Sequence, residues 1–328
     1  MTHAIIAGIG AYLPQRVLTN ADLEKMVETS DEWIVTRTGV RERRIAAEGE
    51  RTSDLAAAAG ISALADAGLR PGDVDLLIVG TSSADYSLPS AAAVAAATMG
   101  LDCPAYDLNA ACTGFIYSLH AGATAIESGR ARTVLVIGAD ALSRFVDWED
   151  RATCVLFGDG AGAVVLSAAD EPGVLGIHLG SDGSGADMII RPTGGALDNC
   201  SAEGLAARGQ YLKMSGSEVF KFAVRAIPKA TRQALKESHL SVEDVTWLVP
   251  HQANQRILDT VADRLGMDHE RVVSTVAQHG NTSAASIPLA LHALYTGGDL
   301  RPGDILAFVG FGAGLTWGAA VVRWTKKG

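Results

Sequence analysis

One cysteine, Cys112, stands in the stretch DLNAACTGFIYSLHAG, where a run of small residues opens onto a helical pattern. A thiol at the start of a helix can act as a nucleophile, because the helix dipole and the free backbone N–H groups there stabilise the thiolate. An unpaired cysteine is more often a small, buried, apolar residue. The stretch alone therefore leaves two interpretations open for Cys112, a catalytic nucleophile and a core residue.

Two further polar residues, His251 and Asn281, could donate hydrogen bonds to a substrate oxygen. His251 follows the strand-like stretch TWLVP, and Asn281 precedes the helical stretch TSAASIPLALHALYTGG. Each also has an ordinary structural interpretation, because a histidine at a strand end can be satisfied by backbone groups and an asparagine before a helix can be its N-cap. A catalytic role for either residue needs a fold that brings it close to the thiol.

The elements that would position these residues occur twice along the chain. Residues 53–80 predict an amphipathic helix, a Gly/Pro turn and a buried strand, and residues 217–251 repeat this order. In both copies further helices and apolar strands follow, so that GAGAVVLSA corresponds to GLTWGAAVVRW. We therefore expect two related α/β halves, at 1–170 and 171–328, whose sheets are buried on both faces. The cysteine falls in the first half, and the histidine and asparagine fall in the second.

The composition of the 328-residue chain predicts a globular protein with a large core, since 48% of its residues are hydrophobic and 20% are charged. Its four cysteines form no CxxC pair and indicate neither a disulfide scaffold nor a zinc site. A cytoplasmic location is therefore expected, and the pattern predicts neither an export signal nor a membrane span. The formal net charge of -10 argues against a general affinity for nucleic acid or anionic membranes.

Two glycine-rich stretches could suggest a dinucleotide site, but neither has the required context. FGDGAGA runs into the apolar strand AVVLSA rather than into a helix, and the GIG at 8–10 is soon followed by Pro14. These contexts exclude a nicotinamide-dependent enzyme.

Taken in order and spacing, six blocks of the sequence resemble the β-ketoacyl-acyl-carrier-protein synthase III family, the initiating condensing enzymes of bacterial fatty acid synthesis. The blocks are SDEWIVTRTGVRERR, NAACTGF, DRATCVLFGDGAGA, HQANQRI, HGNTSAASIP and GFGAGLTWGAAVVRW. The resemblance runs nearly end to end. It implies a thiolase-like α/β fold in which two pseudo-symmetric halves form a five-layered αβαβα sandwich, and this agrees with the internal repeat.

The resemblance implies a decarboxylative condensation of an acyl-CoA primer with malonyl-acyl carrier protein. Cys112 would hold the primer as a thioester, and His251 with Asn281 would stabilise the enolate that remains when the malonyl group loses CO2. The family further points to the backbone N–H groups of Cys112 and Ala313 as donors to the oxyanion on the acylated cysteine. The products would be a β-ketoacyl-acyl carrier protein, CO2 and CoA, and no metal or redox cofactor is expected.

The same residue types separate the chain from related families. Elongating condensing enzymes use a cysteine with two histidines, and degradative thiolases carry a second cysteine near the C-terminal loop, which reads GFGAGLTWG here. Retention of Cys112 argues against a non-catalytic partner of a condensing enzyme. Ketosynthase-III-like and chalcone-synthase-like enzymes of polyketide or secondary metabolism, which use another primer or acceptor, are the alternative function.

The resemblance also implies a coenzyme A site formed by Trp33, Arg37, Arg151 and Asn254. Trp33 and Arg151 would flank the adenine, with Arg37 nearby, since stacking and cation–π contacts can hold a flat base. In the alternative interpretation, Trp33 is a core tryptophan and the run RTGVRERR is a solvated charged face.

An acyl pocket lined by Leu88, Leu142 and Phe157 is implied in the same way. In the family, the residue at the position of Leu88 comes from the partner subunit of a homodimer and closes the pocket, often as phenylalanine. The smaller leucine is expected to admit primers longer or more branched than acetyl. Pocket volume depends on backbone shape, so the sequence does not identify the primer.

Docking of an acidic carrier protein to this net acidic chain needs a local basic patch. The stretch SEVFKFAVRAIPKATRQALKES places five basic residues at helical spacing, which would form a stripe on one face: Lys221, Arg225, Lys229, Arg232 and Lys236. Lys221, Arg225 and Arg256 are the expected docking residues, and the resemblance of SEVFKFA and HQANQRI to the family's carrier-docking region favours Lys221 and Arg256 among them. The alternative interpretation is an ordinary solvated helix face, which Pro228 would bend.

Overall fold

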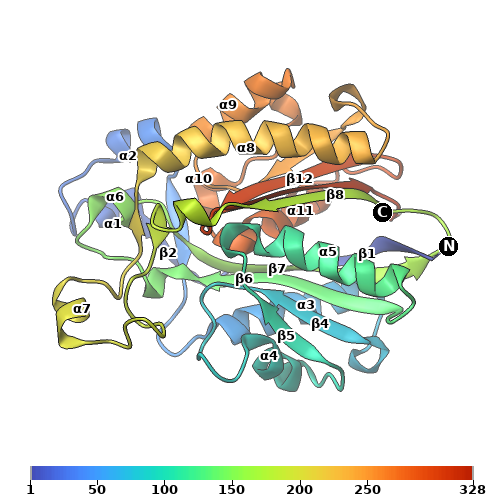
Figure 1. Ribbon diagram of the computed structural model, residues 1–328, viewed down its shortest axis with the longest axis horizontal. Coiled ribbons are helices and arrows are strands. Elements are labelled where there is room, and N and C mark those ends of the chain that lie inside the picture. Colours follow the sequence, from blue (N-terminus) through green and yellow to red (C-terminus); the bar gives the residue numbers. More distant parts are fainter. Residues whose placement is uncertain (1, 327–328) are drawn as a thin grey trace.

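Two β-sheets lie on opposite sides of a central pair of helices in the computed structural model, which describes residues 2–326 (Figure 1). Further helices cover the outer face of each sheet, so the order of layers is helix, sheet, helix, sheet, helix. Because both sheets are covered on both faces, their strands are almost continuously apolar. The five-layered α/β sandwich that the sequence predicts is therefore confirmed.

The first sheet has five strands, all drawn from residues 3–169. Across the sheet they lie in the order β1 (His3–Tyr12), β7 (Asp159–Ala169), β6 (Thr133–Ala141), β4 (Leu76–Gly80) and β5 (Ala105–Leu108). β4 is parallel to β5 and β6, whereas β7 is antiparallel to β1 and β6. Two alanine-rich helices cover the outer face, α3 (Thr52–Ala67) and α4 (Ala91–Met99).

The second sheet repeats this order with four strands from residues 174–323. They are β8 (Val174–Ser181), β13 (Thr316–Arg323), β12 (Ile305–Gly312) and β11 (Trp247–Pro250). A single bridge between Leu248 and Val272 stands where the first sheet has its fifth strand. The outer helices here are α8 (Gly216–Glu237) and α9 (Gln255–Leu265). Within residues 2–326, no helix combines the length and the apolar character needed to cross a membrane.

The central layer consists of α5 (Gly114–Glu127) and α11 (Ser286–Thr296), and each helix contacts both sheets. Their side chains join one buried apolar cluster, in which the ring of Phe115 lies 6.2 Å from the ring of Phe308 on β12. The turns that precede the two helices also contact each other. Residues just before α5 and just before α11 are therefore brought together at one end of a buried apolar layer.

Segments that lie outside the repeat gather around that end (left side of Figure 1). Residues 13–51 and 142–158 form short elements there: β2 (Arg16–Thr19), α1 (Asn20–Leu23), α2 (Asp31–Thr38), β3 (Glu42–Ile45) and α6 (Arg151–Cys154). Residues 182–215 and the approach to α11 add β9 (Ile189–Ile190), α7 (Ala202–Ala206), β10 (Lys213–Met214) and α10 (Val276–His279). These segments supply much of the wall around the cavities described next.

Candidate active site

Cys112 lies in a 3-10 turn, Ala111–Thr113, between β5 and α5. Ala111 adopts a left-handed conformation with φ of 47°, which is uncommon for a residue with a side chain. Oδ1 of Asn109 supports this conformation by accepting a hydrogen bond from the Ala111 N–H at 3.2 Å. The structure therefore places the thiol where a loop enters a helix, at the seam between the two sheets.

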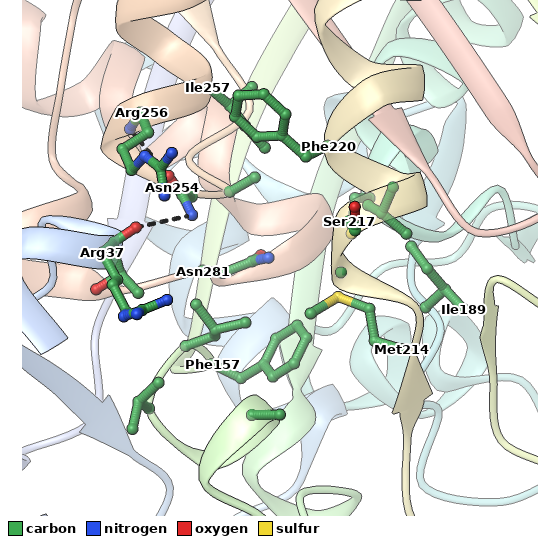
Figure 2. Close-up of a pocket in the computed structure, with 18 of the residues that line it drawn as sticks. Arg37, Phe157, Ile189, Met214, Ser217, Phe220, Asn254, Arg256, Ile257 and Asn281 are labelled. Atoms are coloured by element: carbon green, nitrogen blue, oxygen red, sulfur yellow. Dashed lines mark hydrogen bonds between the residues drawn. The ribbon is translucent and has the colours of Figure 1, made fainter. Parts of the chain in front are cut away.

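A second turn of the same kind carries Asn281. Ser283 has φ of 51° in the 3-10 turn Ser283–Ala285 before α11, and Oδ1 of Asn281 accepts a hydrogen bond from the Ser283 N–H at 2.9 Å. Asn281 thus takes the place that Asn109 has in the first turn, and Ala284 takes the place of the cysteine. The side-chain oxygen caps this turn rather than the helix, which leaves the amide NH2 group for a ligand, and Figure 2 shows the side chain reaching into a cavity.

The backbone N–H groups of the two turns differ in their surroundings. The Ala284 N–H donates to the fully buried carboxylate of Asp140 on β6 at 3.1 Å. Asp140 lies two residues after Gly138 on β6. The equivalent position on β12, two residues after Gly310, is Gly312. A Cβ atom on Gly312 would lie 2.7 Å from the nitrogen of Cys112, so glycine keeps the space beside that nitrogen open. A protein carboxylate therefore satisfies the Ala284 N–H, whereas glycine, which has no carboxylate, stands beside the corresponding N–H of Cys112.

His251 directly follows β11 and is almost fully buried, with 2% of its surface exposed. Its backbone N–H donates to the carbonyl of Val309 at 2.7 Å, and its ring meets the ring of Phe311 edge-on with 5.6 Å between the centroids. Burial lowers the pKa of His251 to about 3, against a smaller opposing effect of the Ser283 backbone. The imidazole is therefore neutral at physiological pH and can either donate or accept a hydrogen bond.

Burial also governs the protonation of Cys112, because it raises the pKa of the thiol to about 12. The hydroxyl of Ser283 lowers this pKa and the charge of Asp140 raises it, but both effects are smaller than that of burial. The sequence suggested that the helix start would stabilise a thiolate, whereas in the folded chain the cost of burying the charge outweighs that stabilisation. The thiol and the imidazole are both uncharged at rest.

Two cavities reach Cys112. The larger, about 780 Å³, is lined by all three candidate catalytic residues (Figure 2). The smaller, about 270 Å³, is lined by Leu142 and Phe157, which the sequence assigns to the acyl pocket, and by Ala313, which it assigns to the oxyanion donors. The structure therefore brings together the predicted nucleophile, its predicted hydrogen-bond donors and two of the three predicted acyl-pocket residues.

The predicted coenzyme A residues meet at one wall of the larger cavity. The guanidinium carbons of Arg37 and Arg151 lie 4.9 Å and 4.7 Å from the centroid of the Trp33 ring. The Asn254 side-chain amide donates to the backbone carbonyl of Arg37 at 3.3 Å, as the dashed line in Figure 2 shows. Trp33, Arg37 and Asn254 line the cavity, so the tryptophan stands at its wall rather than in a closed core.

Two of the three predicted docking residues lie at this cavity. Lys221 and Arg256 line it, and Arg225 stands one turn further along α8 on the exposed surface. Lys221 is paired with Glu218 at 2.7 Å, which reduces its net contribution to a basic patch. The whole basic stripe of α8 is exposed, and the helix continues without interruption through Pro228.

Leu88 is the predicted pocket residue that the chain does not bring to its own site. Its side chain is 88% exposed, and it is not among the residues that line either cavity. An exposed apolar side chain on a loop is available to a second subunit, so its insertion into a partner's pocket stays a prediction.

Sequence reasoning missed several residues that line the larger cavity. They are Ile189, Met214, Ser217 and Phe220 (Figure 2). The first two belong to the irregular segment 182–215, and the others to the first turns of α8. No motif or periodicity marks Ile189 and Met214, whereas Ser217 and Phe220 lie in the block SEVFKFA but were not assigned to the cavity.

Comparison with known proteins gives full-length matches. Two family models match the chain, 3-oxoacyl-[acyl-carrier-protein] synthase III over residues 106–183 and its C-terminal counterpart over residues 235–324. A β-ketoacyl-[acyl-carrier-protein] synthase III from Xylella fastidiosa strain 9a5c is 50% identical over 323 residues, which is 98% of each chain.

Solved structures agree with these matches. The 3-oxoacyl-type synthase III of Thermus thermophilus has 46% sequence identity and a TM-score of 0.91, and the match covers 98% of this chain and 100% of that one. The priming β-ketosynthase of the R1128 polyketide pathway has a TM-score of 0.93 at the lower identity of 36%, with 99% and 97% of the two chains covered.

The uncharged state of Cys112 predicts how fast the thiol reacts with iodoacetamide. Alkylation is expected to accelerate about tenfold per pH unit from about pH 6 to about pH 9, because only the small thiolate fraction reacts. The measurement is mass spectrometry of the peptide that carries Cys112, with the exposed Cys200 as a reference. A rate that levels off near neutral pH would contradict the prediction, since it would indicate a thiolate paired with a charged imidazole.

Proposed function

The chain belongs to the 3-oxoacyl-[acyl-carrier-protein] synthase III family, and we propose that Cys112, His251 and Asn281 carry out its condensation. A member of this family is a condensing acyltransferase that initiates fatty acid synthesis from an acyl-CoA and malonyl-acyl carrier protein. The polyketide alternative has a more distant relative, at 36% rather than 50% identity. The observation that carries the proposal is that the three residues, which come from separate parts of the sequence, line one cavity.

In the first half-reaction, the sulfur of Cys112 attacks the thioester carbonyl of the primer. The thiol proton must leave as the S–C bond forms, and the neutral ring of His251 is the acceptor in the same cavity. The charge that develops on the carbonyl oxygen is held by the N–H groups of Cys112 and Ala313. The C–S bond to coenzyme A then breaks, and the released thiolate takes up the proton, which restores the neutral imidazole.

In the second half-reaction, malonyl-acyl carrier protein occupies the larger cavity. The C–C bond to its carboxylate breaks, CO2 leaves, and the electron pair passes to the thioester oxygen as an enolate. His251 and the Asn281 amide donate to this oxygen, and their burial strengthens both hydrogen bonds. The enolate carbon attacks the acyl carbon on Cys112, the new C–C bond forms, and the C–S bond breaks. The cysteine leaves as a thiolate, which takes up one proton from solvent.

Several further features belong to the same proposal. The residues 1–170 and 171–328 act as two halves that supply the nucleophile and the donors respectively. Trp33, Arg37, Arg151 and Asn254 bind coenzyme A, and the smaller cavity holds the primer. The enzyme works in the cytoplasm as a homodimer whose Leu88 closes the pocket of the partner. No metal or redox cofactor is needed, because protein N–H groups serve both oxygen charges.

The division of labour predicts different effects for two substitutions. Incubation with radiolabelled acyl-CoA should label Cys112 alone, and Cys112→Ala should take no label. Asn281→Ala should still be acylated, within about threefold of the wild-type rate, but should condense at least about 100-fold more slowly, because its task begins at decarboxylation. Label on Cys103 or Cys154, or equal loss of acylation in both variants, would refute the assignment.

The primer can be identified with a panel of acyl-CoA thioesters from acetyl to long and branched chains. Each is assayed with malonyl-acyl carrier protein and separately with malonyl-CoA. Leu88→Phe is expected to shift the preference toward shorter primers by about tenfold, because a larger ring takes up pocket volume. An unchanged chain-length profile would show that Leu88 does not close the pocket, and repeated extension with free malonyl-CoA would favour the polyketide alternative.

Carrier docking is tested by reversing two charges at the cavity mouth. Lys221→Glu with Arg256→Glu should raise the KM for malonyl-acyl carrier protein by about tenfold or more, with a strong salt dependence, while acylation by acyl-CoA stays within a few-fold. Lys229→Glu with Lys236→Glu makes the same change in charge further along α8 and is the matched control. Equal damage to both half-reactions would mean that the first pair binds coenzyme A or shapes the cavity.

A further inference from the structure

Arg43 on β3 is fully buried, and no carboxylate within residues 2–326 forms an ion pair with it. Its guanidinium donates to the carbonyl of Leu18 at 3.2 Å, to Oδ1 of Asn20 at 2.9 Å and to the carbonyl of Val155 at 2.8 Å. Its Nε has no hydrogen-bond partner among the described atoms. Burial lowers the pKa of Arg43 to about 10, so the group still carries its charge at neutral pH. A buried cation without a counter-charge is costly to stability, which calls for another reason for its presence.

Arg43 donates to the segment 155–158, and the same segment forms two backbone hydrogen bonds with Asn281, which we call the clamp. Immediately after Val155, the carbonyl of Leu156 accepts a hydrogen bond from the Asn281 N–H at 2.8 Å, and the Gly158 N–H donates to the Asn281 carbonyl at 3.0 Å. These two bonds fix both sides of the Asn281 peptide backbone. The bond from Arg43 to Val155 therefore acts one residue away from the clamp.

The side chain of Arg43 also forms part of the surface on which this clamp packs. A Cβ atom on Gly158 or on Gly280, the residue before Asn281, would lie 3.1 Å or 3.3 Å from the Cβ of Arg43. Both segments of the clamp therefore pass close to the Cβ atom of Arg43. Because these contacts are made by the Cβ atom, a substitution that keeps a side chain retains them and removes only the bonds of the guanidinium.

The other end of the guanidinium reaches the wall where coenzyme A is proposed to bind. Asn20, which accepts from Arg43, donates to Oδ1 of Asp31 at 2.7 Å. Asp31 is the first residue of α2, the helix that carries Trp33 and Arg37. Hydrogen bonds of the buried Arg43 guanidinium therefore connect the wall of the cavity mouth to the segment that fixes the backbone of Asn281.

We propose that Arg43 is a positioning residue for Asn281, which fixes the amide at the distance and angle that decarboxylation needs. The inference rests on the proposed role of Asn281 in stabilising the enolate. A misplacement of about 1 Å at such a donor can reduce the rate by about 100-fold. Acylation of Cys112 does not use Asn281, so it is expected to tolerate the loss of Arg43.

The test compares Arg43→Met with Asn281→Ala and with Arg44→Met. Arg44 is the matched control, because it is the neighbouring arginine on β3 but its guanidinium donates to the carbonyl of Pro14. The measurements are acylation of Cys112 by acyl-CoA, kcat and KM for CO2 release from malonyl-acyl carrier protein on the acylated enzyme, and the midpoint of thermal unfolding. Arg43→Lys is the second variant, since a single ammonium cannot bond to Asn20 and Val155 in the way that a planar fork does.

Arg43→Met should release CO2 at least about tenfold more slowly, with KM and the acylation rate within about threefold of wild type. Its unfolding midpoint should change by only a few degrees, because removal of an unpaired buried charge offsets the loss of the bonds to Leu18, Asn20 and Val155. Arg43→Lys should lose kcat in the same assay, and it decides the matter if the Met variant does not fold. Arg44→Met should stay close to wild type in every measurement.

Two outcomes separate the inference from the function on which it rests. If Asn281→Ala loses CO2 release but Arg43→Met and Arg43→Lys keep it, the positioning role is overturned and the role of Asn281 stands. If Asn281→Ala itself keeps CO2 release, the proposed role of Asn281 fails, and the inference about Arg43 falls with it. Equal loss of acylation and CO2 release in Arg43→Met, with a lower unfolding midpoint, would also overturn the inference, because it would indicate a general structural role.

Discussion

Burial of the seam between the two sheets is the constraint on which the site depends. The same burial raises the pKa of Cys112 to about 12 and lowers that of His251 to about 3. A permanent thiolate–imidazolium pair would commit the histidine to one task. A neutral imidazole can accept the thiol proton in one half-reaction and donate to an oxygen in the other, and the low polarity of the seam strengthens each hydrogen bond that it makes.

Duplication explains how one fold could supply both the proposed nucleophile and its proposed donors. The turns before α5 and α11 share a left-handed residue and an asparagine whose side-chain oxygen accepts the N–H of that residue. In one turn the following residue is Cys112, and Gly312 leaves its N–H accessible. In the other it is Ala284, and the carboxylate of Asp140 takes up its N–H. Two nearly identical turns therefore differ in the residue that follows the left-handed one and in a single residue on the strand beside each.

The sequence predicted the layers well, because the repeat and the continuously apolar strands are properties of pattern, and packing follows pattern. It also named residues that do line the cavities, such as Phe157 and Ala313. It did not predict the neutral thiol, because burial depends on how both halves close over Cys112 and not on its neighbours in the chain. Met214 was missed for a related reason, since it lies in a segment that the repeat does not contain, whereas Phe220 lies in a repeated helix whose pattern does not show that it faces the cavity.

Formation of the new C–C bond places a geometric demand on the donors. As the enolate carbon attacks, negative charge leaves the oxygen of one thioester and appears on the oxygen of the other. A single set of hydrogen-bond donors could not stabilise both oxygens. Two sets of donors are needed on either side of the forming bond, and each must be in place before the charge moves. The proposed sets meet this demand, with His251 and Asn281 in the larger cavity and Ala313 beside the smaller one. Cys112 lines both cavities, so the acyl carbon that it carries would sit where the two oxygen sites face each other.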